Sequence, residues 1–266
     1  MSSPTTISLC YNDIGKNRVR HLLLQIPVCE DIVIINSDGP ASARHQPDAG
    51  KSGTMENEMN MDDLKKGDMI FFGRYPQKKG PSADAEPIEW IVLETDGKTA
   101  KLLSRYGLTA KPYDKDGWWP VVWENCTLRK WLNGEFLNAA FTDEEKQRLV
   151  NVKIEPECFP FLIEMHDTVD KVFILDDEEV EKYFKDYDER ICIPTEKAIG
   201  EGAYVGENRG SGCWWWLRTP SISMANFIYV VDTDGSFDKD GFPVDAFGEN
   251  DHDNIVVRPA IVLNLD

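Results

Sequence analysis

Hydrophobic and polar residues alternate along the segment 87–94, whose sequence is PIEWIVLE. A period of two is typical of a β-strand that buries one of its faces. An Asp-Gly pair follows, and the segment 98–108 is again rich in strand-forming residues. Because Asp-Gly favours a tight turn between two strands, the pattern predicts a β-hairpin, with a further strand over 69–72 just before it.

The period changes to that of a helix over 127–141, sequence TLRKWLNGEFLNAAF. Leu128, Trp131 and Leu132 have the spacing that places side chains on one face of a helix, and two further apolar residues extend this face. Asn125 or Thr127 is expected to cap the helix, because short polar side chains accept hydrogen bonds from its first N–H groups.

Two capping boxes predict further helices. Thr142 is followed three residues later by Glu145, which indicates a short helix that ends near residue 150. A strand over 172–175 leads into a second box formed by Asp176 and Glu179. The acidic residues in this first turn suit the helix dipole, so capping explains them better than catalysis.

The last fifty residues consist of two apolar end segments and an insert of another kind. The end segments are 212–220 (GCWWWLRTP) and 256–265 (VVRPAIVLNL), and the insert is 221–254. The insert contains eight acidic residues against one lysine, interleaved with five aromatic residues. Short polar side chains mixed with rigid aromatics are typical of recognition surfaces. We therefore expect the end segments to be buried and the insert to form a contact surface.

Arg218 and Arg258 each lie within apolar sequence of the end segments. A buried guanidinium is costly unless it reaches a carboxylate or backbone carbonyls. A structural clamp is the preferred interpretation of both, and a ligand contact is the alternative. The residues expected in the core are Trp90, Trp131, Phe136, Trp215, Leu217, Val257 and Ile261.

The chain divides into three parts by composition. Residues 1–38 contain two short strand-like runs, at 6–11 and 31–36, and residues 39–60 have the Gly, Pro and Ser content of a flexible linker. Residues 61–266 form the predicted globular domain. The linker contains AGKSGT, but it lacks the first glycine of a phosphate-binding loop and no strand precedes it, so nucleotide binding is not predicted.

Charge and apolar runs limit the partners. The formal net charge of −18 argues against nucleic acid, whose phosphates are bound by Lys and Arg. No run reaches the roughly 20 apolar residues that a membrane helix needs, and no secretory signal is recognisable. The sequence therefore predicts a cytoplasmic or phage-associated protein. It carries no pattern that sets an oligomeric state.

The sequence contains no strong metal or nucleophile motif. The six cysteines are spread singly without a CxxC pair, so buried free thiols are expected. Asp232, Asp234, Asp238 and Asp240 form an Asp-rich stretch, but its match to a calcium-binding loop is poor. Successive tight turns at the two Asp-Gly pairs are the preferred interpretation, with a calcium site from these carboxylates as the alternative. No cofactor and no catalytic residue are predicted.

Several motifs together resemble a known family. FGRYPQ, PIEWIVL, WENCTLRKWLNGEFLNAAFTDEEK, DKVFIL, WWWLRTP and VVRPAIVLNL resemble, in this order, a bacterial domain family of unknown function that is common in gut Firmicutes and their phages. The end segments are also similar to those of the variable proteins of diversity-generating retroelements. This resemblance implies an α+β, C-type-lectin-like fold of the formylglycine-generating-enzyme type. It also implies ligand-binding residues at Ser221, Ser223, Asn226, Phe227, Tyr229, Asp232, Asp238, Asp240, Phe242, Asp245, Phe247, Asn250 and His252.

The resemblance implies recognition of a protein or glycan rather than catalysis. Trp118, Trp119 and the loop 202–212 are expected to assist the insert. An alternative is an enzyme on the same scaffold, either a formylglycine-generating-like oxidase or a hydrolase. The related oxidases use a pair of copper-binding cysteines, and only Cys213 has a comparable position, with no second cysteine near it in the sequence. A third possibility is a structural or assembly module that holds a partner through residues 1–60.

Overall fold

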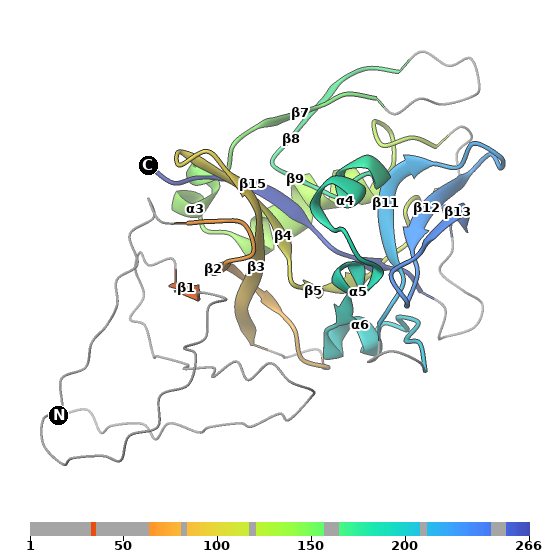
Figure 1. Cartoon of the computed structure of the whole chain (residues 1–266), viewed down its shortest axis with the longest axis horizontal. Coiled ribbons are helices and arrows are strands. Elements are labelled where there is room, and N and C mark those ends of the chain that lie inside the picture. Colours follow the sequence, from red (N-terminus) through yellow and green to blue (C-terminus); the bar gives the residue numbers. More distant parts are fainter. Residues whose placement is uncertain are drawn as a thin grey trace, which may run out of the picture. The chain divides into compact units, whose positions relative to one another are not determined.

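The computed structural model describes residues 33–35, 64–80, 84–116, 121–156, 165–207, 212–245 and 254–266 (Figure 1). The predicted strand at 6–11 and the linker at 39–60 lie outside these ranges, as do Trp118 and Trp119. Three predicted ligand-binding residues, Phe247, Asn250 and His252, also lie outside them. The described residues form mixed sheets with few helices, as expected for an α+β protein.

The larger sheet has six strands in the order β1-β2-β3-β4-β15-β9. The strands are β1 (Val33–Ile35), β2 (Met69–Pro76), β3 (Ala85–Thr95), β4 (Thr99–Ser104), β15 (Ala260–Asn264) and β9 (Val172–Phe173). All neighbouring strands in this sheet are antiparallel. The sheet thus joins residues from both ends of the described chain.

The predicted hairpin is confirmed as β3 and β4. The Asp96 side chain accepts hydrogen bonds from the backbone N–H groups of Lys98 and Thr99, at 2.9 and 2.6 Å. Gly97 has a φ of +82°, a conformation that side chains other than glycine rarely adopt. Local turn chemistry therefore sets the pairing of these strands.

The second sheet has five strands in the order β13-β12-β11-β14-β6. The strands are β13 (Phe237–Pro243), β12 (Phe227–Val231), β11 (Trp215–Pro220), β14 (Val256–Val257) and β6 (Thr109–Ala110). Two small pairs complete the strands, β10 (Ile193–Pro194) with β5 (Tyr106–Gly107), and β7 (Val152–Ile154) with β8 (Thr168–Asp170). In Figure 1 the blue strands β11, β12 and β13 lie at the right of the molecule.

The C-terminal end segment does not form a single strand. β14 pairs with β11 and β6 in the five-stranded sheet, whereas β15 pairs with β4 and β9 in the six-stranded one. The chain changes sheets at Arg258 and Pro259, where the Pro259 carbonyl accepts the N–H of Ser104 at 2.8 Å. Proline has no N–H to donate to a strand, which suits this crossover. The end segment is therefore the link between the two sheets.

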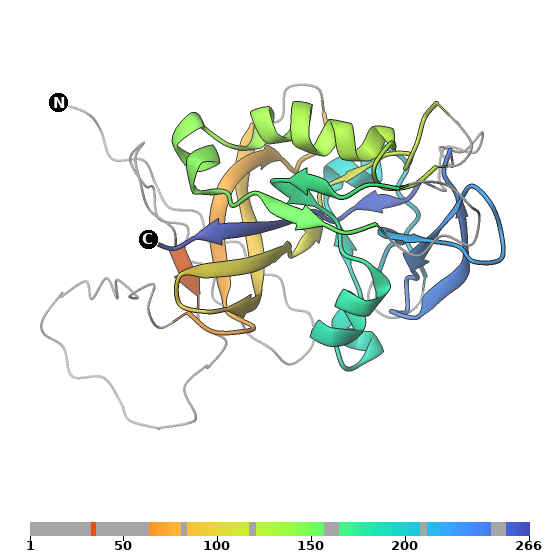
Figure 2. The same ribbon diagram turned by 90° about the horizontal axis from the view of Figure 1, so that it is seen from above.

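The predicted helix over 127–141 is continuous but not uniform. It consists of α1 (Thr127–Trp131), a π-helical turn η2 (Leu132–Phe136) and α2 (Leu137–Ala140). Figure 2 shows this helical segment along one side of the sheets. Its N-cap is Cys126, whose Sγ accepts the N–H of Arg129 at 3.3 Å, so the prediction of Asn125 or Thr127 was wrong.

Both capping boxes are confirmed. Thr142 and Glu145 cap α3 (Asp143–Arg148), and Asp176 and Glu179 cap α4 (Asp177–Tyr183). Two short helices follow, α5 (Tyr187–Arg190) and α6 (Glu196–Gly200). Within the described ranges, no helix is long and apolar enough to cross a membrane.

Six of the seven predicted core residues are fully buried, and the exception is Trp131. Trp131 is half-buried because it lies at the helix surface beneath the ammonium group of Lys111, 4.6 Å from the ring centre. Trp215, Trp216 and Leu217 of β11 are buried, as expected for an apolar end segment. Trp214 precedes β11 and is only half-buried, so the predicted buried run begins one residue later.

Candidate functional site

The described part of the insert forms a hairpin at the edge of the five-stranded sheet. β12 pairs with β13 in the antiparallel register Ile228 to Phe242 and Val230 to Asp238. The turn at Asp234 and Gly235 is present, because the N–H of Asp232 donates to the carbonyl of Ser236 at 2.7 Å. The insert therefore extends the core sheet.

A turn between strands was also predicted at the second Asp-Gly pair, and this prediction was wrong. Asp240 and Gly241 form a bulge inside β13, where Asp238 Oδ1 accepts both of their N–H groups, at 3.0 and 3.1 Å. Gly241 has a φ of +77°, and a Cβ at this position would lie 2.6 Å from the carbonyl oxygen of Ile228. Only glycine allows this close approach of the two backbones.

Two of the predicted ligand-binding residues are buried, which contradicts their expected exposure. Ser221 has 0% of its surface exposed, and its Oγ accepts the N–H of Met224 at 3.2 Å within a tight loop. Tyr229 is 5% exposed, because β12 is flanked by β11 on one side and β13 on the other. Neither side chain can contribute much to a contact surface.

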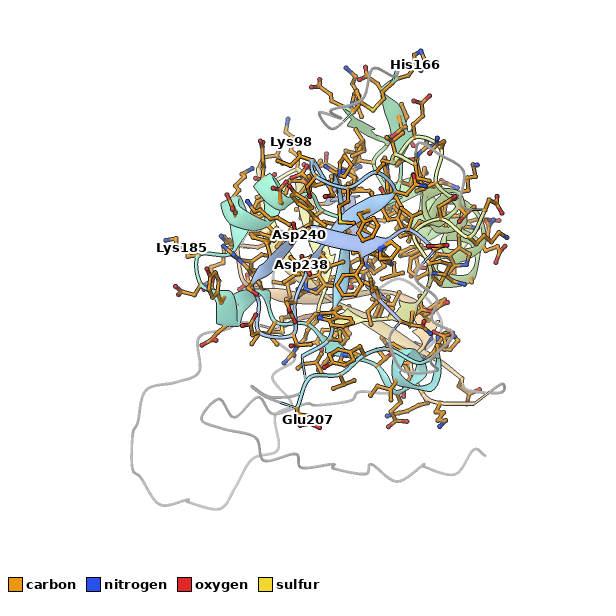
Figure 3. The ribbon with its side chains drawn as sticks, turned by 90° about the vertical axis from the view of Figure 1, so that its right-hand side faces the viewer. Lys98, His166, Lys185, Glu207, Asp238 and Asp240 are labelled. Carbon is orange, nitrogen blue, oxygen red and sulfur yellow. The ribbon has the colours of Figure 1, made fainter. Side chains whose placement is uncertain are left out.

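The remaining described residues of the prediction lie at or near the surface. Ser223, Asp240 and Asp245 are exposed. Those that are half-buried are Asn226, Phe227, Asp232, Asp238 and Phe242. Figure 3 shows the side of the molecule on which Asp238 and Asp240 lie near the middle, with His166 projecting at the top.

Three half-buried aromatic rings meet beside this hairpin, and we refer to Tyr204, Trp214 and Phe242 as the aromatic cluster. The rings of Tyr204 and Trp214 are stacked, with centroids 4.1 Å apart and an interplanar angle of 18°. The ring of Phe242 lies 4.5 Å from that of Trp214 at an angle of 45°. Each ring thus keeps part of its surface in solvent while the stack fixes its orientation.

The polar neighbours of the cluster hold it in place. The indole Nε1 of Trp214 donates to Asp232 Oδ1 at 2.8 Å, and Thr233 Oγ1 donates to the same oxygen at 3.0 Å. Tyr204 is held through its backbone N–H, which donates to the carbonyl of Asn254 at 3.0 Å. The cluster is therefore assembled from three separate segments of the chain.

Sequence reasoning identified Phe242 but missed Tyr204 and Trp214. Trp214 was assigned to the buried end segment, and Tyr204 was included only as part of the loop 202–212. A single tyrosine in a glycine-rich loop, just before a tryptophan run, is the sequence signal that could have indicated the pair.

The described part of the insert is acidic. Between residues 221 and 245 the sequence has five aspartates, and Lys239 is its one basic residue. Within the described ranges, no group of three or more His, Cys, Asp or Glu residues is arranged to hold a metal ion. Asp238, one of the carboxylates considered for calcium, has an oxygen engaged by the two N–H groups of the bulge.

Arg218 forms the predicted clamp at the opposite end of β11. It is 4% exposed and donates to Asp176, to Glu179 Oε2 at 2.8 Å and to the carbonyl of Ile174. Burial raises the pKa of Glu179, but Arg218 and Lys101 outweigh this effect and bring that pKa to about 2. The clamp therefore ties β11 to the first turn of α4 through an ionised carboxylate.

Arg258 has a structural role of another kind. It is 1% exposed, and its Nε donates to the carbonyl of Ser104 at 3.0 Å. Its guanidinium lies 4.9 Å from the ring centre of Trp215, within the range of a cation–π contact. Arg258 thus stabilises the crossover between the sheets.

A small hollow lies away from the cluster. Its lining includes Trp123, Glu124, His166 and Arg218. His166 Nδ1 lies 3.1 Å from Glu124 Oε1, and both side chains are exposed. The one hydroxyl side chain of the described lining is that of Thr168, and it donates to Asp170 Oδ2 at 2.7 Å.

The three described cysteines, Cys126, Cys192 and Cys213, are buried free thiols, as predicted. Cys213 has no second cysteine near it in the sequence, but the fold brings one beside it. Cys192, distant in sequence, lies directly opposite Cys213 in an antiparallel bridge.

Comparison with known sequences identifies a family. Residues 97–265 match the family described as "Domain of unknown function (DUF6273)". Comparison with curated proteins and with solved structures gave no match. The matching region includes β4, all the helices, the five-stranded sheet and β15. Because the match covers more than half of the chain, this protein belongs to the DUF6273 family.

Proposed function

We propose that this chain is a non-enzymatic recognition domain that binds a protein or glycan ligand through the surface of the aromatic cluster. The observation that carries the proposal is the set of three half-exposed, mutually packed rings, whose central indole is fixed by Asp232. Asp238 and Asp240 lie on the same strand as Phe242.

The physical basis of the proposal is preorganisation. Aromatic side chains provide a large contact area with few rotatable bonds, so they lose little conformational entropy on binding. Here the stack and the Trp214 hydrogen bond restrict the rings before any ligand arrives. Rings ordered in advance leave more of the contact energy available as affinity.

The proposal includes a C-type-lectin-like fold of the kind displayed by the variable proteins of diversity-generating retroelements. It is supported by the sequence resemblance and by the contrast between the buried end segments and the half-exposed strand β13. It is further supported by β15, which returns to the sheet of the first strands and anchors the end of the insert. A surface carried in this way tolerates substitution at its exposed positions, because the buried side chains lie in the end segments and in β12.

A screen followed by a matched pair of variants tests the proposal. The full-length chain is applied to a glycan array and to a protein array, and the strongest ligand is titrated. Phe242→Ala should weaken this binding about tenfold or more, which corresponds to about 1.4 kcal/mol. Phe237→Ala is the control, because its register places Phe237 on the other face of β13, where it contacts Arg190.

Equal affinity of the two variants for the ligand would show that the cluster is not the binding surface. Circular dichroism of both variants verifies that the comparison is between folded proteins.

A further inference from the structure

Cys192 and Cys213 lie opposite each other in the structure. They are direct partners in an antiparallel bridge, and the N–H of Cys213 donates to the carbonyl of Cys192 at 2.9 Å. The Sγ of Cys213 lies 3.2 Å from the same carbonyl oxygen. Residues opposite each other in antiparallel strands have Cα separations of about 4.5–5.5 Å, within the range that a disulfide spans.

A buried cation, the guanidinium of Arg258, lies near this cysteine pair. Arg258 is buried, and its guanidinium donates hydrogen bonds to the carbonyls of Ser104 and Arg190. Its positive charge acts on both thiols. A nearby guanidinium favours the thiolate form of a cysteine.

The two thiols respond differently to their surroundings. Burial raises the pKa of Cys192, but the hydrogen bond with Cys213, the charge of Arg258 and the N–H of Gly107 outweigh burial, so the pKa lies below its usual value. Burial and its partner thiol raise the pKa of Cys213. Of the two, Cys192 is therefore the better nucleophile and Cys213 is the proton-bearing partner.

Cys126 provides an internal comparison. It is equally buried, but burial raises its pKa to about 12, and its contacts are with Trp123 and Arg129 rather than with a second thiol. Burial alone therefore does not explain the character of the Cys192–Cys213 pair.

We propose that Cys192 and Cys213 form an oxidation site that reacts with small hydroperoxides and closes to a disulfide. The Cys192 thiolate attacks one oxygen of hydrogen peroxide, the O–O bond breaks, and the leaving hydroxide takes up a proton to become water. Cys213 then attacks the sulfur of the Cys192 sulfenic acid, the S–O bond breaks, and a second water leaves with the proton of Cys213. Two thiols are oxidised and one peroxide is reduced to two waters.

The size of the oxidant follows from burial. Neither thiol has exposed surface, so an oxidant reaches the attacking sulfur only through a local opening of the structure. A peroxide is close to water in size and needs a much smaller opening than a bulky disulfide does. The product would join the segment before β10 to the residue that directly precedes Trp214. This inference does not depend on the proposed ligand-binding function.

The test uses the full-length chain and hydrogen peroxide. After timed exposure the protein is unfolded, alkylated and digested with trypsin, which places Cys192 in peptide 191–197, Cys213 in peptide 210–218 and Cys126 in peptide 116–129. The expected product is a linked pair of the first two peptides, lighter by two hydrogen atoms than their sum. Cys192 should be lost about tenfold or more faster than Cys126, because the thiolate fraction changes tenfold for each pKa unit.

A Cys213→Ser variant tests the assignment of roles. Without the second thiol, Cys192 should stop at the sulfenic acid and become labelled by dimedone. Recovery of Cys192 and Cys213 as free thiols, or their oxidation at the rate of Cys126 without a linked peptide, would overturn the proposal. Because the main readout uses the unaltered chain, the outcome does not depend on whether the variant folds.

Discussion

The indole Nε1 of Trp214 donates a hydrogen bond of 2.8 Å to Oδ1 of Asp232, which joins the residue before β11 to the residue after β12. This bond fixes the middle ring of the aromatic cluster relative to the hairpin that carries Phe242. Asp232 thus has a structural role, although it belongs to an acidic part of the sequence.

Replacing Asp232 with alanine should loosen the aromatic cluster. The indole would lose its acceptor, and a lost hydrogen bond of this kind lowers the free energy of unfolding by about 1 kcal/mol. Asp232→Asn is the matched control, because its amide oxygen can still accept from Trp214 while the charge is gone. Urea denaturation measures both variants. An equal loss in the two would attribute the effect to charge rather than to the hydrogen bond.

Removing the Arg218 clamp should be far more costly. Arg218→Met leaves Asp176 and Glu179 without their buried cation, and breaking a buried ion pair from one side costs about 3–5 kcal/mol. Lys153→Met removes an exposed pair with Asp167 and should change stability by less than about 1 kcal/mol. Similar denaturation midpoints for the two variants would contradict the structural role of Arg218.

The Glu179 carboxyl should make stability depend on pH in the acid range. Its pKa is lowered in the folded state, so its contribution is present above its ordinary value of 4.5 and is lost as the pH falls towards about 2. The stability difference between the wild type and Glu179→Gln should therefore shrink over this interval. Glutamine preserves the capping box, so the comparison isolates the charge. A difference that stays constant with pH would refute this assignment.

The bulge in β13 should not tolerate a side chain at Gly241. Gly241→Ala combines a positive φ with a Cβ only 2.6 Å from a backbone oxygen, and we expect a loss of about 2–3 kcal/mol, the upper part of the range for strained backbone. Gly97→Ala is the control, because Gly97 also has a positive φ but has open space around it. Thermal unfolding measures both variants. Because both share the cost of a positive φ, the difference between their stability losses gives the cost of the close contact at Gly241. Equal shifts would show that β12 moves away freely.

The elements that depend only on neighbouring residues were predicted correctly from the sequence. The Asp96-Gly97 turn and the capping boxes at Thr142 and Asp176 depend on residues within four positions of each other, and all three are present. The buried character of Trp215 follows from the same short-range pattern. Such features can be predicted because neighbouring residues determine them.

Features that depend on distant residues were not predicted. The change of sheets at Arg258 follows from pairing with strands more than a hundred residues away, and no local pattern encodes it. The same holds for the pairing of Cys192 with Cys213. The burial of Tyr229 was missed because β12 gains its outer neighbour only when the insert folds back as β13.

The most direct test of the account is the dissociation constant of the ligand for Trp214→Ala, measured by titration calorimetry beside Tyr187→Ala. Tyr187 is 56% exposed on α5 and lies outside the aromatic cluster. The account predicts a loss of affinity of about tenfold or more for Trp214→Ala and wild-type affinity for Tyr187→Ala. Unchanged binding by a folded Trp214→Ala protein would contradict it.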